Sequence, residues 1–447
     1  MTDPDQRRRL LIVSPSFPPM NAPDLQRARM SLPYYREYGW EPIVLTVNPI
    51  FQDGSREEAL LSTVPTDVKI YGCGALSLKW SRRIGLGNLG LRAWVHLLLL
   101  GARIIRREKI DLVFLTNTQF VTFILGRIWL NWLGVPYVID LQDPWRTDYY
   151  ERRGSRQPPG GWKYQLARIQ AWLFEGWSFR RMSALMSVSQ HYIAELSQRY
   201  SWFAGVPTAV IRFGASETDL AAAKTLAPLT PSTAARPDVL RFVYTGAAGP
   251  IMPHALKVLF GGLSLFRERQ PALSARLQFD FLGTSYASPG FGKITVRPIA
   301  EEFGVAHQVT EIPHRLGHLE CLRLQAQADV LLLLGSSDLA YSPSKIYPYF
   351  LSGRPMLAIV FKKSYLEEII GELSCACTIS FDELAAKTTA HEQLCQFFEL
   401  ALAGFPPGSL PKRNHELFQQ EFLARTLTGR QCDLFTRAII PSSSVQL

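Results

Sequence analysis

The sequence predicts an α/β protein made of two doubly wound domains, each built on a mostly parallel sheet. Three observations favour this fold class. Short apolar, β-branched runs alternate with helical patterns. The alternation stops over residues 217–237 and then restarts, and small or polar residues follow most of the apolar runs. At 447 residues, the chain is long enough for two domains of ordinary size.

The first domain is expected over residues 1–215. Helices are predicted over 25–38 and 120–133, because each helical period ends just before a glycine, Gly39 or Gly134. The predicted strands are runs rich in Leu, Ile and Val, at residues 10–13, 42–47, 68–71, 111–116, 137–141, 184–188 and 208–213.

A linker is predicted over residues 216–237, where Ala, Thr, Pro and Ser dominate and no apolar period survives. A second domain follows over 238–413. A last helical stretch within 414–440 is expected to cross back to the first domain. The second domain has predicted strands at 241–244, 277–282, 330–334 and 355–360, and predicted helices near 255–267, 319–328 and 344–351.

Two such domains are expected to bind ligands at the carboxyl ends of their strands, which explains polar residues there. Turns after strands are polar in any protein, so only the repetition of this pattern favours a site.

The net charge of +10 is confined to the first half of the chain. Residues 1–215 carry 27 Lys and Arg against 17 Asp and Glu, whereas residues 216–447 carry 21 of each. Such an excess suits an anionic membrane surface, a nucleic acid or a phosphorylated ligand. We expect no nucleic-acid partner, because the basic residues follow no recognisable nucleic-acid-binding motif.

The chain is expected to be cytoplasmic, with the inner face of the plasma membrane as a peripheral site. The most apolar stretch, 89–105, is interrupted by Arg92, His96 and Arg103, so it is not a transmembrane helix. The apolar run after Arg9 ends at Ser14, too early for a signal peptide. Six scattered cysteines without a C-x-x-C pair suit a reducing compartment.

Two basic stretches that contain Trp, 79–107 and 162–181, are candidates for contact with anionic lipid. The alternative is that their apolar faces pack on the sheet while the arginines lie in solvent. The sequence leaves both interpretations open.

Four segments occur in an order that resembles the GT-B glycosyltransferases, particularly the GT4-like enzymes that use nucleotide sugars. The resemblance implies two Rossmann-like domains facing across a cleft, with the acceptor in the first domain and the donor in the second. The four segments are the Ser-Pro-Ser-Phe-Pro-Pro loop at 14–19, the strand at 134–145 ending in Asp-Pro-Trp, the Phe-Val-Tyr-Thr-Gly run at 242–246, and the Ser-Pro-Ser-Lys helix within 328–355.

Lys345 is the donor-site candidate with the clearest physical reason. It falls in the first turn of the predicted helix, where a cation faces the positive end of the helix dipole unless an anion is bound. The alternative is that Lys345 points into water. Ser342 suits the N-cap and Pro343 the first helical position. The full set of predicted donor-binding residues is Thr245, Gly246, Ser342, Ser344, Lys345 and Tyr347.

The sequence departs from the family where related enzymes place glutamates, since it has Pro348 and Ala340 at those positions. Asp338 is the nearest carboxylate and the predicted substitute, with a catalytic role. Because proline is unfavourable inside a helix, this helix is expected to be kinked or to begin later than residue 344.

Asp143 is the candidate catalytic carboxylate of the first domain, since the Asp-Pro-Trp sequence fixes its backbone and places an aromatic wall beside it. Its alternative role is to cap a helix or turn. The histidine that relatives carry after the fourth strand has no counterpart in this sequence. The predicted acceptor or cleft-loop residues are Pro18, Pro19, Asn21, Asn117 and Gln119.

The resemblance implies transfer of a sugar from a nucleoside diphosphate sugar to a sugar or lipid-linked acceptor hydroxyl, in the synthesis of a cell-surface polysaccharide or glycolipid. No cofactor is expected, and no metal, because no Asp-x-Asp motif lies where a donor diphosphate would need it. The alternatives are a nucleotide-sugar epimerase of the same architecture and a catalytically degenerate GT-B subunit that binds a partner.

Overall fold

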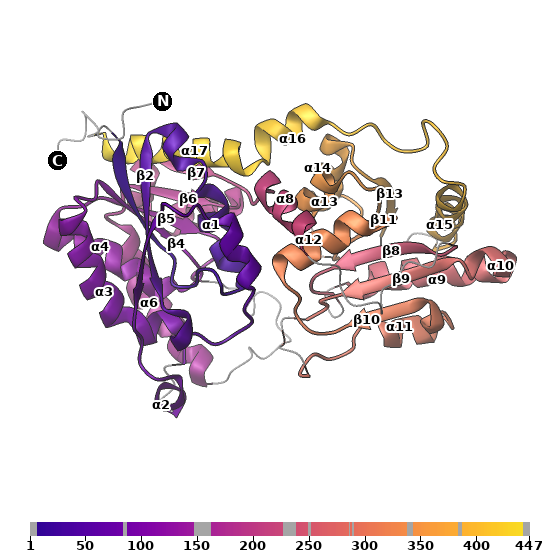
Figure 1. The fold of residues 1–447 in the computed structure, drawn as a ribbon, viewed down its shortest axis with the longest axis horizontal. Coiled ribbons are helices and arrows are strands. Elements are labelled where there is room, and N and C mark those ends of the chain that lie inside the picture. The colour runs from indigo at the N-terminus through magenta and orange to yellow at the C-terminus, as the bar shows by residue number, and fades with distance from the viewer. Residues whose placement is uncertain are drawn as a thin grey trace. The chain divides into compact units, whose positions relative to one another are not determined.

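The computed structural model describes residues 7–83, 87–146, 162–226, 238–248, 252–285, 287, 290–337, 343–382 and 387–440. Contacts between residues divide the chain into two compact units (Figure 1). The first domain contains the described residues up to Phe213 and those from Ala424 onward, and the second domain is Gly214–Leu423.

The first domain is built on a seven-stranded sheet in the order β3-β2-β1-β4-β5-β6-β7, and its strand pairs are parallel. The strand order reverses between β1 and β4, which places the point where doubly wound sheets bind ligands at the carboxyl ends of these two strands. The strands are β1 (Arg8–Val13), β2 (Trp40–Val47), β3 (Lys69–Cys73), β4 (Leu112–Thr116), β5 (Tyr137–Leu141), β6 (Ala184–Ser187) and β7 (Thr208–Val210).

Helices cover both faces of this sheet. One face packs against α3 (Leu89–Arg107), α4 (Phe123–Leu133), α6 (Trp162–Phe179) and α7 (Gln190–Arg199). The other face packs against α1 (Gln26–Ser31), the 3-10 helix η3 (Tyr35–Tyr38) and α17 (Ala424–Ile439), which comes from the far end of the chain. The first domain is therefore complete only when α17 is in place.

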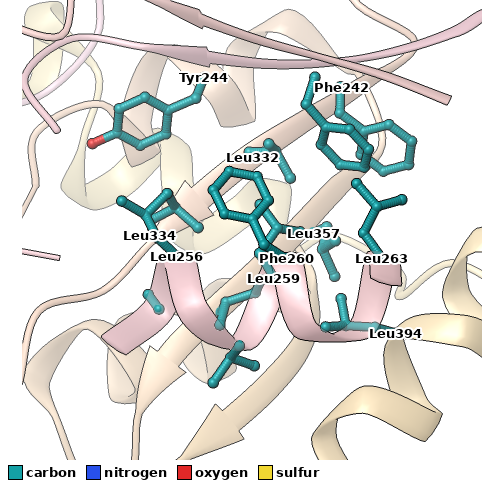
Figure 2. Packing of buried hydrophobic residues seen from close by; sticks show 14 of the residues in the cluster. Phe242, Tyr244, Leu256, Leu259, Phe260, Leu263, Leu332, Leu334, Leu357 and Leu394 are labelled. Carbon is teal, nitrogen blue, oxygen red and sulfur yellow. The ribbon is translucent and has the colours of Figure 1, made fainter. Parts of the chain in front are cut away.

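The second domain has a six-stranded parallel sheet in the order β10-β9-β8-β11-β12-β13. Its order reverses between β8 and β11. Figure 2 shows apolar side chains of α9 (Pro253–Arg269), among them Leu256, Leu259 and Phe260, packed against the sheet. The strands are β8 (Leu240–Thr245), β9 (Leu277–Leu282), β10 (Val309–Ile312), β11 (Val330–Leu334), β12 (Met356–Phe361) and β13 (Cys377–Phe381).

The remaining helices of the second domain include α8, α12 and α13, which pack on one another. They are α8 (Glu217–Thr225), α10 (Pro271–Ser274), α11 (Arg297–Glu302), α12 (His318–Gln327), α13 (Ile346–Ser352), α14 (Tyr365–Leu373), α15 (Lys387–Leu402) and α16 (His415–Glu421).

The structure differs from the predicted elements in four places. The helix predicted over 25–38 is broken by Pro33, which has no N–H to continue the helix, so α1 and η3 are separate. The predicted linker begins with α8, which starts after Ser216, whose Oγ accepts a hydrogen bond from Asp219 N at 3.2 Å. The last helix is two helices, α16 and α17. The edge strands β10 and β13 were missed, because each is short and only partly buried.

Candidate functional site

Two glycines lie side by side at the carboxyl edge of the second sheet. Gly246 follows β8 with φ +99°, and Gly283 follows β9 with φ +77°. Gly246 N donates to Leu282 O at 2.8 Å, and a Cβ added to Gly283 would lie 3.8 Å from Gly246 N. Gly283 N likewise donates to a carbonyl, Ile312 O, at 2.9 Å. Because neither glycine has a Cβ, a phosphate can approach this part of the backbone closely.

Lys345 lies over this glycine loop, as the predicted donor site requires. A Cβ added to Gly246 would lie 3.4 Å from Lys345 Nζ. Nζ donates a hydrogen bond of 2.5 Å to Tyr244 Oη and lies 3.7 Å from the centroid of the Tyr244 ring. Tyr244 Oη donates in turn to Ala247 O at 2.7 Å. The lysine is therefore held by the strand that ends in the loop.

The charge of Lys345 is poorly compensated in the second domain. Burial lowers the pKa of Lys345 from its ordinary 10.5 to about 7, against a small opposite effect of the nearby Cys321 thiol. Among the described residues, no carboxylate forms an ion pair with Lys345. A bound anion would stabilise the protonated amine at this position.

Thr245 is positioned by two residues that sequence reasoning missed. Thr245 N donates to Tyr349 Oη at 3.0 Å, and Gln325 Nε2 donates to Thr245 Oγ1 at 2.8 Å. Tyr349 lies one helical turn beyond Lys345, so its spacing was a usable signal. Gln325 comes from α12, and nothing in its local sequence pointed to this contact.

The other predicted donor residues lie in different environments. Tyr347 is almost fully buried and stacks on Phe422 with ring centroids 4.7 Å apart, so the structure gives it a packing role. Ser344 is exposed in the turn before α13. The predicted N-cap Ser342 and the predicted catalytic Asp338 lie outside the described residues.

The helix itself begins at Ile346, which confirms the expectation from Pro348 that it starts later than residue 344. Lys345 occupies the N-cap of α13, and Pro343 begins the preceding turn, in which Ile346 N donates to Pro343 O at 3.4 Å. The prediction that Pro343 is the first helical residue is wrong. Pro348 is the third residue of α13, where its missing N–H has no intrahelical acceptor to lose, so the helix tolerates it.

In the first domain, hydrogen bonds join the loops after β1, β4 and β5. Asn117 Nδ2 donates to Val13 O at 3.2 Å. Thr118 Oγ1 donates to Asp24 Oδ2 at 3.2 Å, and Gln142 Nε2 donates to Asp24 O at 3.3 Å. These loops therefore form one connected edge at the point where the strand order reverses.

Asp143 lies at this edge beside Asp24. The residue is solvent-exposed, but protein atoms around its carboxylate partly desolvate it, which raises its pKa, and repulsion from Asp24 adds to the effect. Trp145 is not the aromatic wall we predicted beside it. Its ring is buried and stacks on Phe120 with centroids 5.9 Å apart, so it anchors the loop from within.

Three of the predicted loop residues are buried or hydrogen-bonded within the first domain. Pro18 is buried and joined to Pro19 by a cis peptide bond. Asn21 is also buried, and its N donates to Ser55 O at 2.9 Å. Gln119 Oε1 accepts a hydrogen bond of 3.3 Å from Gly90 N in the first turn of α3.

A buried ion pair beneath the same edge was not predicted. Arg27 Nε lies 2.8 Å from Asp140 Oδ2, and both side chains are almost completely buried. Thr116 Oγ1 donates to the same carboxylate oxygen at 2.8 Å. The pair links α1 to β5, the strand that leads to Asp143, and so stabilises this edge of the sheet.

The described residues lack two kinds of feature. None of their helices combines the length and apolar character needed to cross a membrane. They also contain no group of three His, Cys, Asp or Glu side chains placed to hold a metal ion.

Comparison with known proteins agrees with this architecture. Residues 26–214 match the sequence model of the glycosyl transferase 4-like domain. No curated protein sequence matches the chain.

Solved structures resemble the chain over nearly its whole length. Sucrose-phosphate synthase from Thermosynechococcus elongatus aligns with a TM-score of 0.59 and 11% identity, covering 98% of this chain and 100% of that one. The Anabaena protein Alr3699/HepE in complex with UDP aligns with a TM-score of 0.55 and 14% identity, covering 96% and 99%. A structure from Listeria monocytogenes described as a UDP-N-acetylglucosamine 2-epimerase gives 0.50 and 12%, covering 96% of each.

These likenesses confirm the predicted fold class and the predicted resemblance to GT4-like glycosyltransferases. The chain has the GT-B fold of two Rossmann-like domains, and residues 26–214 of the first domain match the model of the glycosyl transferase 4-like domain.

Proposed function

We propose that the chain transfers a sugar from a nucleoside diphosphate sugar to an acceptor hydroxyl. The observation that carries the proposal is the position of Lys345, whose ammonium lies over Gly246 at the carboxyl edge of the second sheet without a carboxylate partner among the described residues. A cation above a glycine backbone that has no Cβ to block the approach is suited to a diphosphate.

In this proposal, Gly246 and Gly283 leave room for the diphosphate beside the backbone. Lys345 binds it and neutralises the charge that develops as the nucleoside diphosphate leaves. Preorganised charge of this kind is commonly a large contribution to catalysis. Tyr244 holds the lysine in place before the donor binds, so little reorganisation is needed. Turnover in this scheme requires no resident metal.

Asp143 is the proposed carboxylate at the acceptor side. Its raised pKa and its place at the edge of the first sheet, where the strand order reverses, suit a group that accepts a proton from an attacking hydroxyl or stabilises positive charge on the sugar. The acceptor is proposed to be a sugar or lipid-linked hydroxyl of a cell-surface polysaccharide or glycolipid.

The donor is proposed to carry a uracil base, because one similar structure was solved with UDP. Melting temperatures measured with UDP, GDP, ADP and dTDP test this directly, since a ligand bound to the folded state raises the melting temperature. We expect the largest shift with UDP, and the same shift after EDTA treatment. No shift with any nucleotide would favour the partner-binding subunit.

Replacing Lys345 with Ala should weaken donor binding by tenfold or more, because a charge-assisted contact to phosphate is lost. Lys362→Met is the matched control, since Lys362 is in the same domain but pairs with Asp382 at 2.9 Å on the surface. Equal affinities for the Lys345→Ala variant, the control and the unmodified protein would remove the phosphate site.

The epimerase remains the second candidate, because one similar structure is described as such an enzyme. The two functions differ in what they consume. An epimerase changes the nucleotide sugar with no acceptor present, whereas a transferase releases the nucleoside diphosphate at full rate only when an acceptor is supplied. Product analysis of the donor alone separates them.

A further inference from the structure

Helix α6 carries its apolar stripe on the outside of the first domain. Leu166, Ile169, Leu173 and Trp177 follow one another at helical spacing and are 54%, 54%, 52% and 38% exposed. The opposite side of the helix is buried through Ala171, Glu175, Ser178 and Phe179. The helix therefore has apolar residues on both sides, whereas an ordinary surface helix exposes mainly polar residues.

The neighbouring helices extend this apolar surface. Trp132 at the end of α4 is 52% exposed, and Val95 and Leu99 on α3 are 57% and 58% exposed. Helix α3 packs on α4 and α4 packs on α6, all on one face of the sheet. We call the outer side of these three helices the α3–α4–α6 face.

Arginines join the aromatic rings across this face. The Arg106 guanidinium of α3 lies 4.9 Å from the centroid of the Trp132 ring on α4. The Arg127 guanidinium of α4 lies 4.6 Å from the centroid of the Trp177 ring on α6. Such pairs put cations at the same level as exposed indoles, which is the arrangement of a surface that contacts lipid headgroups.

The charge of these segments is almost entirely positive. Residues 78–107, 123–133 and 162–181 together contain twelve Lys or Arg and a single acidic residue, Glu175. Glu175 is buried and forms an ion pair of 2.6 Å with Arg199, so it contributes no negative charge to the outer surface. A second copy of the same face would be repelled, whereas an anionic surface would be attracted.

We propose that the α3–α4–α6 face docks the protein on an anionic lipid bilayer. The apolar stripe of α6, with Trp172 at 65% exposure beside it, inserts at the level of the headgroups. The surrounding arginines bind the lipid phosphates. This proposal is independent of the donor site, because every residue it uses belongs to the first domain, whereas Lys345 belongs to the second.

Flotation with vesicles tests the proposal with the full-length protein. We expect binding to vesicles of phosphatidylcholine with 30% phosphatidylglycerol, weak binding to pure phosphatidylcholine, and loss of binding as salt rises. Ile169→Ser combined with Leu173→Ser, and separately Arg103→Glu combined with Arg168→Glu, should each lower the fraction bound by at least about tenfold.

Matched controls separate the face from general surface effects. Phe291→Ser removes an apolar side chain that is 81% exposed in the second domain, and Arg276→Glu combined with Arg297→Glu reverses two exposed charges there. These controls should bind vesicles like the unmodified protein. Circular dichroism checks that every variant is folded.

Three results would overturn the proposal: no binding to anionic vesicles at low salt, an equal loss in the controls, or a protein that is dimeric until the Ile169 and Leu173 changes make it monomeric. Nucleotide binding, measured in parallel by thermal shift, reports on the donor site and is expected to stay unchanged in all variants.

Discussion

Lys345 makes opposite contributions to stability and to ligand binding. Burial favours its neutral form in the folded domain, with a pKa of about 7 against 10.5 in an exposed chain. Between these two values the unfolded state binds more protons, so stability rises with pH; below pH 7 the full penalty for the buried charge is present. A phosphate reverses this preference, because it stabilises the protonated amine.

Lys345→Met should therefore raise the melting temperature of the ligand-free protein at pH 6, and the gain should shrink as pH rises toward 10. The affinity of the unmodified protein for a nucleoside diphosphate sugar should fall as pH rises above about 7, since the amine must then gain a proton on binding. Thermal scans and calorimetry across this range measure both trends. A Lys345→Met variant whose affinity falls just as steeply would assign the effect to another group.

Asp143→Asn keeps the size of the side chain and removes its charge. If the carboxylate takes part in the transfer, kcat should fall by about 10²–10⁴-fold, as expected for loss of a general base, while the melting shift with nucleotide stays the same. Full turnover in Asp143→Asn would leave only a capping role for this residue. Asp24→Asn is no control here, because Asp24 joins two loops of the same edge.

Residue roles were predictable from the sequence only where local spacing carried them. Lys345 could be singled out as a candidate because it precedes a helix that follows a buried strand. Gln325, which fixes Thr245, comes from a helix 80 residues away in the chain, and no local pattern marks that contact. The sequence contains too little information on Trp145 and Tyr347 for a related reason, since an aromatic residue next to a polar motif can line a site or pack into the core. Stacking on Phe120 and on Phe422 shows that both rings pack inside their domains.

At the level of elements, the strands of the first sheet and the central strands of the second sheet were predictable, but the edge strands of the second sheet were not. β5, β9 and β11 lie where their largely apolar runs predicted them. β11 is continuously apolar, as expected for a strand covered on both faces. β10 and β13 lie at sheet edges and carry polar residues, so their sequences look like loops. Helix α8 was taken for a linker because its Ala-rich sequence has no apolar period.

The close approach of α3 to α4 depends on Gly101. A Cβ at this position would lie 2.2 Å from Trp129 Cζ2, and the Trp129 ring is fully buried. Gly101→Ala should destabilise the first domain by about 1–3 kcal/mol through overpacking, although alanine favours the helix itself.

Chemical denaturation measures the effect of Gly101→Ala. Gly205→Ala is the control, since a Cβ there meets no atom within 4 Å. If both variants unfold at the same denaturant concentration, the two helices can separate without cost, and the packing of the α3–α4–α6 face is looser than the contact implies.

On the scale of the whole chain, α17 ties the C-terminal end to the first domain. Phe435 packs against Phe114 and Trp40 with ring centroids 4.9 and 5.6 Å away, and Tyr35 Oη donates to Gln431 Oε1 at 2.8 Å. Phe435→Ala should cost about 3–5 kcal/mol and lower the stability of the first domain, although residue 435 is more than two hundred residues beyond Phe213.

Denaturation followed by tryptophan fluorescence measures how Phe435→Ala changes the unfolding transition of the first domain, because most tryptophans lie in that domain. The control is Phe405→Ala, which removes a half-buried phenylalanine from the second domain and should spare this transition. An unchanged first-domain transition in Phe435→Ala would show that α17 covers the sheet without stabilising it.

The return of α17 also sets the order in which a ribosome can finish the protein. The first domain leaves the exit tunnel early, but the groove that Phe435 fills stays open until α17 is made. At about 5–20 residues per second, the two hundred or so intervening residues take roughly 10–40 s. The half of the protein that is translated first is thus the half that matures last, and chaperones have that interval in which to cover its bare aromatic surface.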